Sequence, residues 1–236
     1  GEAELWARQA LNMALGRGGD QVAVKQNDTY EFFGGLSKGV EKRDKVRTRV
    51  IAATLADHIR SSDKVFIMGH RFSDLDSVGS AVGIWAVVKK GLGRNAFIVV
   101  NRGQSLAHQL IDQVDDAYPE TKIFISSQEA LQTLTGKTVV VVVDTHSTSL
   151  VECPELIEDA QRIIVIDHHR MTVNYIQNTL IFYHEPYASS ASEMVTELVQ
   201  YLTDREDVLP VETLSLLAGI VLDTKNFSVR TGARTF

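Results

Sequence analysis

Short apolar segments alternate with amphipathic segments along most of the chain, and the alternation begins near residue 45. The segment at 139–143 contains only valine, which indicates a strand whose two faces are both buried. Apolar strands separated by helices are typical of a parallel sheet with helices on both faces, so the pattern predicts a doubly wound, mostly parallel α/β domain. The expected strands are 64–68, 96–100, 122–125, 139–143 and 162–166, with 180–183 as a further candidate, and the expected helices include 46–59, 77–90, 106–114, 128–134, 190–203 and 211–222.

The N-terminal residues have a different pattern, with a helix expected at 2–15 and a hairpin of two strands expected at 21–25 and 29–33. One helix and one hairpin are too small to form an independent hydrophobic core. We therefore interpret residues 1–33 as the end of an upstream domain or as a flap on the next one. The glycine- and charge-rich residues 34–44 are the expected junction, and the main domain is expected at 45–236.

Composition and charge narrow the class of protein. Of the 236 residues, 44% are hydrophobic and 23% are charged, which is typical of a soluble globular protein. The formal net charge of −6 disfavours a protein that binds long nucleic acids through a broad basic surface. The single cysteine, Cys153, excludes an intrachain disulfide and suits a reducing compartment. The longest apolar run, 138–143, is too short to span a bilayer, and the acidic start of the chain does not resemble a signal peptide.

Histidines and aspartates follow three of the expected strands. They are His70, Asp74 and Asp76 after the strand at 64–68, Asp144 after the strand at 139–143, and Asp167, His168 and His169 after the strand at 162–166. Because the carboxyl ends of parallel strands meet at one edge of the sheet, where ligands bind, we expect these side chains to lie close together. So many carboxylates in one crevice would repel one another unless cations held them.

The types of side chain indicate which cations would bind. Carboxylate oxygens with imidazole nitrogens and no thiolate suit Mn²⁺, Mg²⁺ or Fe²⁺ better than structural zinc. The number of candidate ligands favours two ions, which in two-metal sites lie about 3.5–4 Å apart, activate a water and stabilise an in-line displacement at phosphorus. Asp144 is the candidate bridge between the two ions, because it follows the strand expected at the centre of the sheet.

Four motifs resemble those of the DHH phosphoesterase superfamily, in the same order along the chain. They are His70-x-x-x-Asp74-x-Asp76, Asp144 after an apolar strand, Asp167-His168-His169, and Gly219-Ile-Val-Leu-Asp223-Thr224, and together they span about residues 65–224. Flanking segments are similar to those of one subfamily, the GdpP-type cyclic-di-AMP phosphodiesterases of bacteria. These segments are Leu15–Lys25, Glu41–Arg43, Met68–Ser77 and Ala188–Glu193.

The resemblance implies roles for individual residues. One ion would be held by His70, Asp74 and Asp144, and the other by Asp76, Asp144, His168 and Asp223. Asp167 would orient its neighbours, as hydrogen-bond partners of metal ligands do. His169 would touch the substrate phosphate or protonate the leaving oxygen. The candidate catalytic residues are therefore Asp144, Asp167 and His169, and the candidate substrate contacts are His169, Arg170, Ser190 and Lys225.

Some residues near these motifs also have simpler interpretations. Ser190 precedes a helix in which Glu193 is placed for a capping box, so capping is the more common use of its hydroxyl. Lys225 is individually more typical of a solvated charge. His146 is a weak candidate because it lies in a loop just after a predicted strand, and His184 is expected to be structural.

The favoured function is a metal-dependent phosphodiesterase that hydrolyses cyclic-di-AMP to linear 5′-pApA, with two Mn²⁺ as cofactors and Mg²⁺ or Fe²⁺ as alternatives. Two other functions remain open: a DHH hydrolase of short oligonucleotides or pyrophosphate, and a nucleotide-sensing module without catalysis. The resembled enzymes carry membrane helices, a PAS domain and a degenerate GGDEF domain before the DHH module. Residues 1–33 would then end the GGDEF-like domain, and the full-length protein would lie at the cytoplasmic face of the membrane.

The resemblance also bears on the assembly and on the activity of this chain alone. The resembled enzymes continue into a second lobe, DHHA1, which helps to hold the substrate and which the sequence ending at Phe236 does not include. We therefore expect this chain by itself to be soluble, to fold and to bind metal, but to turn over its substrate poorly. A homodimer is a candidate assembly.

Overall fold

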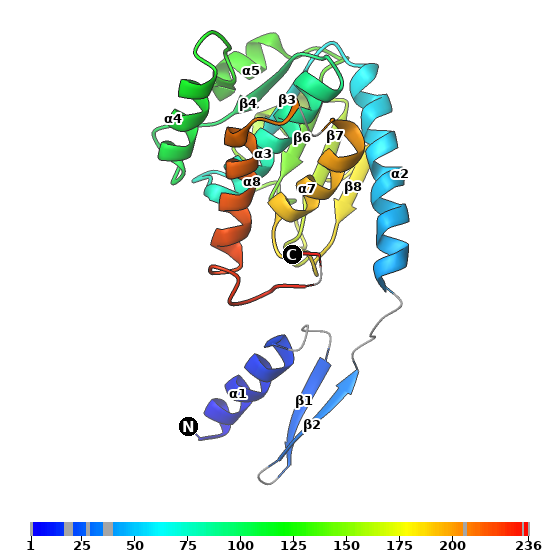
Figure 1. The fold of residues 1–236 in the computed structure, drawn as a ribbon, viewed down its shortest axis with the longest axis vertical. Coiled ribbons are helices and arrows are strands. Elements are labelled where there is room, and N and C mark those ends of the chain that lie inside the picture. Colours follow the sequence, from blue (N-terminus) through cyan, green and yellow to red (C-terminus); the bar gives the residue numbers. More distant parts are fainter. Residues whose placement is uncertain are drawn as a thin grey trace.

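A parallel sheet of six strands forms the centre of the main domain (Figure 1). The structure, a computed structural model, describes residues 2–16, 21–26, 29–34, 40–204, 207–232 and 234–235. The strands lie in the order β5–β4–β3–β6–β7–β8, and every neighbouring pair is parallel. They are β3 (Val65–Met68), β4 (Ala96–Val99), β5 (Phe124–Ile125), β6 (Val139–Val143), β7 (Ile163–Asp167) and β8 (Ile181–His184). The predicted parallel α/β class and the candidate strand at 180–183 are confirmed.

The direction in which strands are added to the sheet reverses between β3 and β6. From β3 the chain moves outward through β4 and β5, and it then returns to β6 on the other side of β3. In open parallel sheets a ligand crevice forms at such a reversal, beyond the carboxyl ends of the two strands. Met68 pairs with Val142, so β3 and β6 end nearly level, and the residues that follow the two strands emerge side by side.

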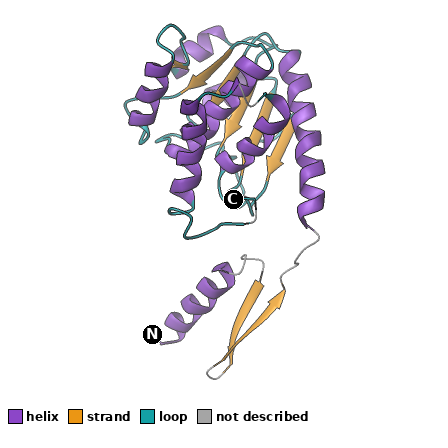
Figure 2. Cartoon of the chain, in the orientation of Figure 1, coloured by secondary structure: helices purple, strands orange, loops and turns teal. Residues whose placement is uncertain are grey.

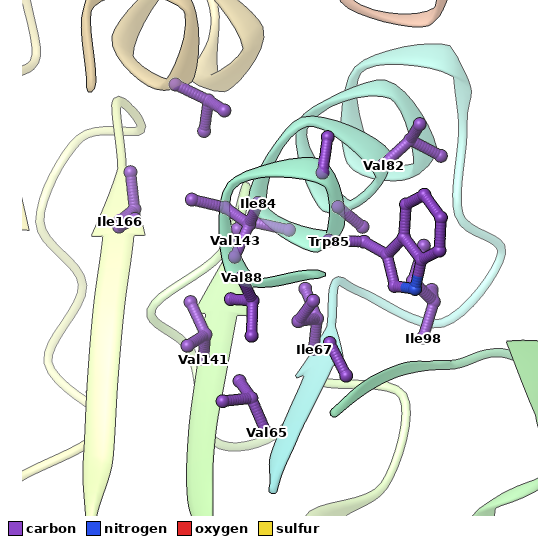
Figure 3. Close-up of a cluster of buried hydrophobic side chains, with 14 of the residues drawn as sticks. Val65, Ile67, Val82, Ile84, Trp85, Val88, Ile98, Val141, Val143 and Ile166 are labelled. Atoms are coloured by element: carbon purple, nitrogen blue, oxygen red, sulfur yellow. The ribbon is translucent and has the colours of Figure 1, made fainter. Parts of the chain in front are cut away.

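Helices cover both faces of the sheet (Figure 2). On one face, Ile67 and Val141 of the strands belong to an apolar cluster with Ile84 and Trp85 of α3 (Figure 3). The valines of β6 alternate between this cluster and a second one on the opposite face, so both faces of the strand are buried, as predicted. The helices are α2 (Val40–Arg60), α3 (Leu75–Ala86), α4 (His108–Ala117), α5 (Ser127–Thr133), α6 (Pro154–Asp159), α7 (Ala191–Leu202) and α8 (Pro210–Asp223), with a π-helical turn, η1 (Val87–Gly91), after α3.

Several element boundaries differ from the prediction. The helix expected at 77–90 begins at Leu75, because Asp74 caps it. Helix α2 begins at Val40, inside the expected junction, where glutamate, lysine and arginine are good helix formers. The sequence pattern does not predict α6, because its 6 residues are too few to reveal a helical period. Two further shifts exceed one residue. The strand expected at 122–125 is reduced to Phe124–Ile125, and the helix expected at 106–114 spans His108–Ala117.

The N-terminal part consists of α1 (Glu2–Gly16) and an antiparallel hairpin of β1 (Gln21–Gln26) and β2 (Thr29–Gly34), as expected. Ala10 and Ala14 are the buried apolar residues among its described side chains. Two buried alanines are too few for an independent hydrophobic core. The assignment of residues 1–33 to an upstream domain stays a prediction. Residues 35–39 of the expected junction lie outside the described part of the chain. Across the described residues, no helix is long and apolar enough to cross a membrane.

Candidate metal centre

His70 and Asp74 lie just beyond β3, at the reversal point of the sheet. Asp74 is the N-cap of α3, and its Oδ1 accepts hydrogen bonds from the backbone N–H groups of Asp76 (2.9 Å) and Ser77 (3.0 Å). The same oxygen lies 3.8 Å from His70 Nε2. Burial raises the pKa of Asp74, but His70 and the two amides outweigh burial and hold the pKa below its usual value. Asp74 is therefore a carboxylate whose position is set by its own helix.

Asp76 lies in the first turn of α3, is fully buried, and is bound by a different helix. Its Oδ2 accepts a hydrogen bond from the backbone N–H of Ala191 (2.7 Å), and its Oδ1 accepts one from Ser192 (2.9 Å), so the carboxylate lies at the N-terminus of α7. Gly219 of α8 leaves room for this contact, since a Cβ there would lie 2.6 Å from Asp76 Oδ1. Burial, followed by the charge of Asp144, raises the pKa of Asp76 well above its usual value. A cation beside Asp76 would lower this pKa by favouring the ionised form.

Asp144 lies between the two sides of the site. It follows β6 directly and has a φ of 60°, a left-handed conformation that aspartate adopts more readily than most residues. Its Oδ2 lies 3.3 Å from His70 Nε2, and its Oδ1 lies 3.5 Å from His168 Nε2. Asp144 Oδ1 and His168 Nε2 are buried and have no hydrogen-bond partner in the described part of the chain. Buried polar atoms nearly always have a partner, so these two atoms indicate a ligand that binds here.

Two groups of side chains that share no residue are each arranged to hold a cation. A third group, of Asp144, His168 and His169, overlaps both of them. The ligand atoms of His70, Asp74 and Asp144 lie within 4.8 Å of one another, and so do those of Asp76, His168 and Asp223. In the second group, His168 Nε2 lies 3.2 Å from the Oδ2 of Asp223, which is the last residue of α8. Oxygen and imidazole donors without a thiolate suit Mn²⁺, Mg²⁺ or Fe²⁺. The fold thus brings together all the side chains that the sequence predicts as metal ligands, and their chemistry fits divalent ions.

The two imidazoles of these groups bind protons tightly. Burial lowers the pKa of His70, but the carboxylates of Asp144 and Asp74 outweigh burial and raise it to about 11. Burial also lowers the pKa of His168, and Asp144 and Asp223 outweigh it and raise the pKa to about 10. A cation at either imidazole would displace the proton, because the ligand nitrogen must offer its lone pair.

Asp167 is fully buried, and imidazoles occupy both of its oxygens. Its Oδ1 accepts a hydrogen bond from the backbone N–H of His169 (3.1 Å) and lies 2.9 Å from His169 Nδ1, while its Oδ2 contacts His146 Nδ1. Burial raises the pKa of Asp167, but the two imidazoles outweigh burial and lower it. His184 Nε2 donates to the carbonyl oxygen of His169 (2.5 Å), in keeping with its expected structural place. Asp167 therefore lies outside both cation groups, and its orienting role stays a prediction.

His146 is a buried neighbour of the metal centre that its place in a loop does not predict. The one pointer in the sequence is its position two residues after Asp144, in the loop that follows β6. A loop histidine carries no periodicity, so its contact with Asp167 becomes visible only in the fold.

The candidate substrate contacts have different environments. Ser190 is the N-cap of α7, and its Oγ accepts a hydrogen bond from the backbone N–H of Glu193 (3.0 Å). Ser190 is fully buried and its hydroxyl is used in this cap, so its contact with a substrate stays a prediction. Arg170 and Lys225 are exposed, and their contact with a substrate stays a prediction.

The sequence model described as DHH family, N-terminal domain, matches residues 64–220. The chain belongs to the DHH family. This DHH-family chain is 44% identical over 234 residues to the cyclic-di-AMP phosphodiesterase PdeA of Listeria monocytogenes, a match that covers 98% of this chain and 35% of PdeA. It is also 44% identical over 233 residues to the cyclic-di-AMP phosphodiesterase GdpP of Bacillus subtilis, with the same coverage of 98% and 35%. The predicted resemblance is confirmed, and the chain spans about a third of the length of these relatives.

The DHH-family fold also recurs in a solved structure, an exopolyphosphatase-related protein from Bacteroides fragilis. The two chains are 17% identical, the TM-score is 0.52, and the match covers 84% of this chain and 55% of the other. At this identity the likeness concerns the fold alone.

Proposed function

We propose that this DHH-family chain is the catalytic domain of a metal-dependent phosphodiesterase that hydrolyses cyclic-di-AMP to linear 5′-pApA. The observation that carries the proposal is the place of Asp144, whose two oxygens face separate groups of histidine and carboxylate side chains. The two curated relatives support the substrate, because their similarity extends over 98% of this chain. We propose two Mn²⁺ as the resident ions, with Mg²⁺ or Fe²⁺ as alternatives.

The proposed reaction needs a deprotonated water and compensation of negative charge at phosphorus. Two bound divalent ions would supply both, by lowering the pKa of water and by neutralising phosphoryl oxygens. The chain supplies the spacing: His70 and Asp74 lie on one side of Asp144, and Asp76 and His168 lie on the other. Since misplacement of about 1 Å can reduce a rate about 100-fold, the rigid attachment of these ligands to strand ends and helix caps favours catalysis.

His169 is the proposed group that contacts the phosphate or protonates the leaving 3′ oxygen. Its Nδ1 is bound to Asp167, which leaves Nε2 for a substrate, and 52% of its side chain is exposed. The hydrogen bond that His169 Nδ1 makes to Asp167 raises the pKa of His169 and outweighs burial. Arg170 and Lys225 are proposed to add positive charge for the substrate phosphates.

Hydrolysis of cyclic-di-AMP, pApA and pyrophosphate by the full-length protein, each with Mn²⁺, Mg²⁺ or EDTA, tests the proposal. We expect cyclic-di-AMP to give pApA with Mn²⁺ and to remain intact with EDTA. Asp144→Asn is the matched inactive control, because asparagine tolerates the left-handed backbone at this position. Preferential hydrolysis of pApA or pyrophosphate would instead assign the chain to the other DHH hydrolases, and binding without turnover would identify a nucleotide-sensing module.

Three expectations from the sequence stay predictions for the full-length protein. They are attachment to the cytoplasmic face of the membrane, assembly as a homodimer, and the absence of binding to long nucleic acids.

A further inference from the structure

His146 is a buried histidine that the proposed reaction does not otherwise use. It lies in the loop after β6, and 1% of its surface is exposed. Its Nδ1 contacts Asp167 Oδ2, and its Nε2 lies 3.0 Å from the backbone nitrogen of Thr172. The ring therefore joins the loop that follows β7 to the carboxylate that holds His169.

The hydrogen bond from Thr172 determines where the His146 ring carries its proton. A backbone N–H can only donate, so His146 Nε2 accepts with its lone pair and is not protonated. Because an ionised carboxylate can only accept, Nδ1 carries the proton that is donated to Asp167 Oδ2. The His146 ring therefore has a defined direction, as an acceptor toward the backbone N–H of Thr172 and a donor toward Asp167.

This donor fixes the rotation of the Asp167 carboxylate. The other oxygen, Oδ1, accepts from the backbone N–H of His169 (3.1 Å) and lies 2.9 Å from its Nδ1. Without the Nδ1–H of His146, Oδ2 would be a buried carboxylate oxygen with no donor, which is costly enough to make the carboxylate rotate or shift. The His169 ring would then lose the acceptor that holds it, and its Nε2 would be less well aligned with a substrate.

We propose that His146 is a positioning residue that acts through Asp167 to align the ring of His169. The inference rests on the proposed function of the site, and it concerns a side chain that has no hydrogen bond to either cation group. A packing role is the alternative, because the ring also lies edge-on to Phe182, with 6.2 Å between centroids, and to His184, at 5.6 Å. Packing depends on the volume of the ring, whereas positioning depends on its Nδ1–H.

Two amide variants separate these roles. In His146→Asn the side-chain amide nitrogen is two bonds from Cβ, as Nδ1 of histidine is, so it can donate to Asp167. In His146→Gln the amide nitrogen is one bond further out, as Nε2 of histidine is, and it lies beside Thr172 instead. Phe182→Leu is the matched control, because it changes the packing against the ring and removes no hydrogen bond. For each variant of the full-length protein, kcat and KM for cyclic-di-AMP, bound Mn²⁺ and Tm are measured.

We expect His146→Gln to lower kcat by about 10–100-fold with KM and bound Mn²⁺ unchanged, which is the range for partners that orient ligand or reacting groups. His146→Asn should retain most of the activity, and Phe182→Leu should lower Tm without a comparable loss of kcat. Equal losses in the two amide variants, or a loss of kcat that follows bound Mn²⁺ or Tm, would overturn the proposal.

A second measurement does not depend on turnover. NMR of the histidine ring nitrogens in the Mg²⁺-loaded protein should show His146 protonated at Nδ1 and unprotonated at Nε2. The ring signals of His169 should change in His146→Gln and remain in place in His146→Asn. A proton on His146 Nε2 would overturn the inference. If the wild-type protein fails to hydrolyse cyclic-di-AMP, the proposed function is wrong, and the ring signals still decide whether His146 positions His169.

Discussion

The carboxylate of Asp76 accepts a hydrogen bond of 2.9 Å from the backbone N–H of Ser192, although 116 residues separate the two along the chain. This contact joins the first turn of α3 to the first turn of α7. A third helix, α8, packs against both through Gly219, where a Cβ would lie 2.2 Å from Ser192 Oγ. One of the two cation groups therefore depends on the packing of three helices.

Gly219→Ala should weaken the cation group of Asp76 more than the group of His70. The new methyl group has to displace Asp76 or α7, since it would lie 2.6 Å from Asp76 Oδ1. Overpacking of this kind reduces the free energy of unfolding by about 1–3 kcal/mol. Calorimetric titration with Mn²⁺ and thermal unfolding measure the two effects.

Gly103→Ala is the matched control for this prediction. A Cβ at Gly103 would meet Asn101 Oδ1 at 3.5 Å, an ordinary contact, so Mn²⁺ binding and Tm should match the wild type. Two intact Mn²⁺ sites in Gly219→Ala would show that the close packing around Asp76 is not needed for binding.

Substitution of Asp144 should impair both cation groups, whereas His70→Ala should mainly weaken one. Asp144 lies close to the imidazole of His70 in one cation group and to that of His168 in the other. His70 lies close to carboxylates of its own group, Asp74 and Asp144. Asp144→Asn is preferable to Asp144→Ala, because alanine at a φ of 60° adds strain of about 1–2 kcal/mol. Anomalous scattering from Mn²⁺ counts the occupied sites in each variant. A single site in the wild type, or two full sites in Asp144→Asn, would contradict the bridging arrangement.

Asp167→Asn should reduce turnover by about 10–100-fold and leave both cation sites occupied. Its oxygens bind His146 and His169 and belong to neither cation group, so the change disturbs orientation rather than ligation. Parallel measurements of kcat and of bound Mn²⁺ separate the two effects. If a cation site were empty in Asp167→Asn, Asp167 would have to be regarded as a ligand.

Binding of the cations should release protons and should strengthen as pH rises. In the metal-free protein the pKa of His70 is raised to about 11 and that of His168 to about 10, so both rings carry a proton at neutral pH. Each proton must leave before the ring nitrogen can bind a cation. Affinity is therefore lowest at acidic pH and increases through the neutral range up to these pKa values. Calorimetry at pH 7.5 in two buffers of different ionisation enthalpy should detect the protons that His70 and His168 release, with a further contribution from Asp76, whose pKa burial raises. An observed heat that is independent of the buffer would contradict this assignment.

The pattern of strands is the part of the fold that the sequence determines most directly. The run of valines at 139–143 predicts a strand buried on both faces, and β6 is buried on both faces. Most of the candidate metal centre follows from the same pattern. His70, Asp144 and His168 follow expected strands, and parallel strands present their carboxyl ends at one edge of the sheet. Their proximity is therefore a consequence of the parallel sheet, which the apolar periodicity predicts, whereas the order of the strands comes from the tertiary structure.

Contacts between distant segments were decided only by the tertiary structure. The sequence places Asp76 near the site, but it does not reveal that the amides of α7 bind this carboxylate. It also does not reveal that the ring of His146 lies between Thr172 and Asp167, or that Ser190 is completely buried. The physical reason is that periodicity reports which face of an element is buried. Which helix end meets which carboxylate depends instead on how helices cross and on where a glycine such as Gly219 lets them approach.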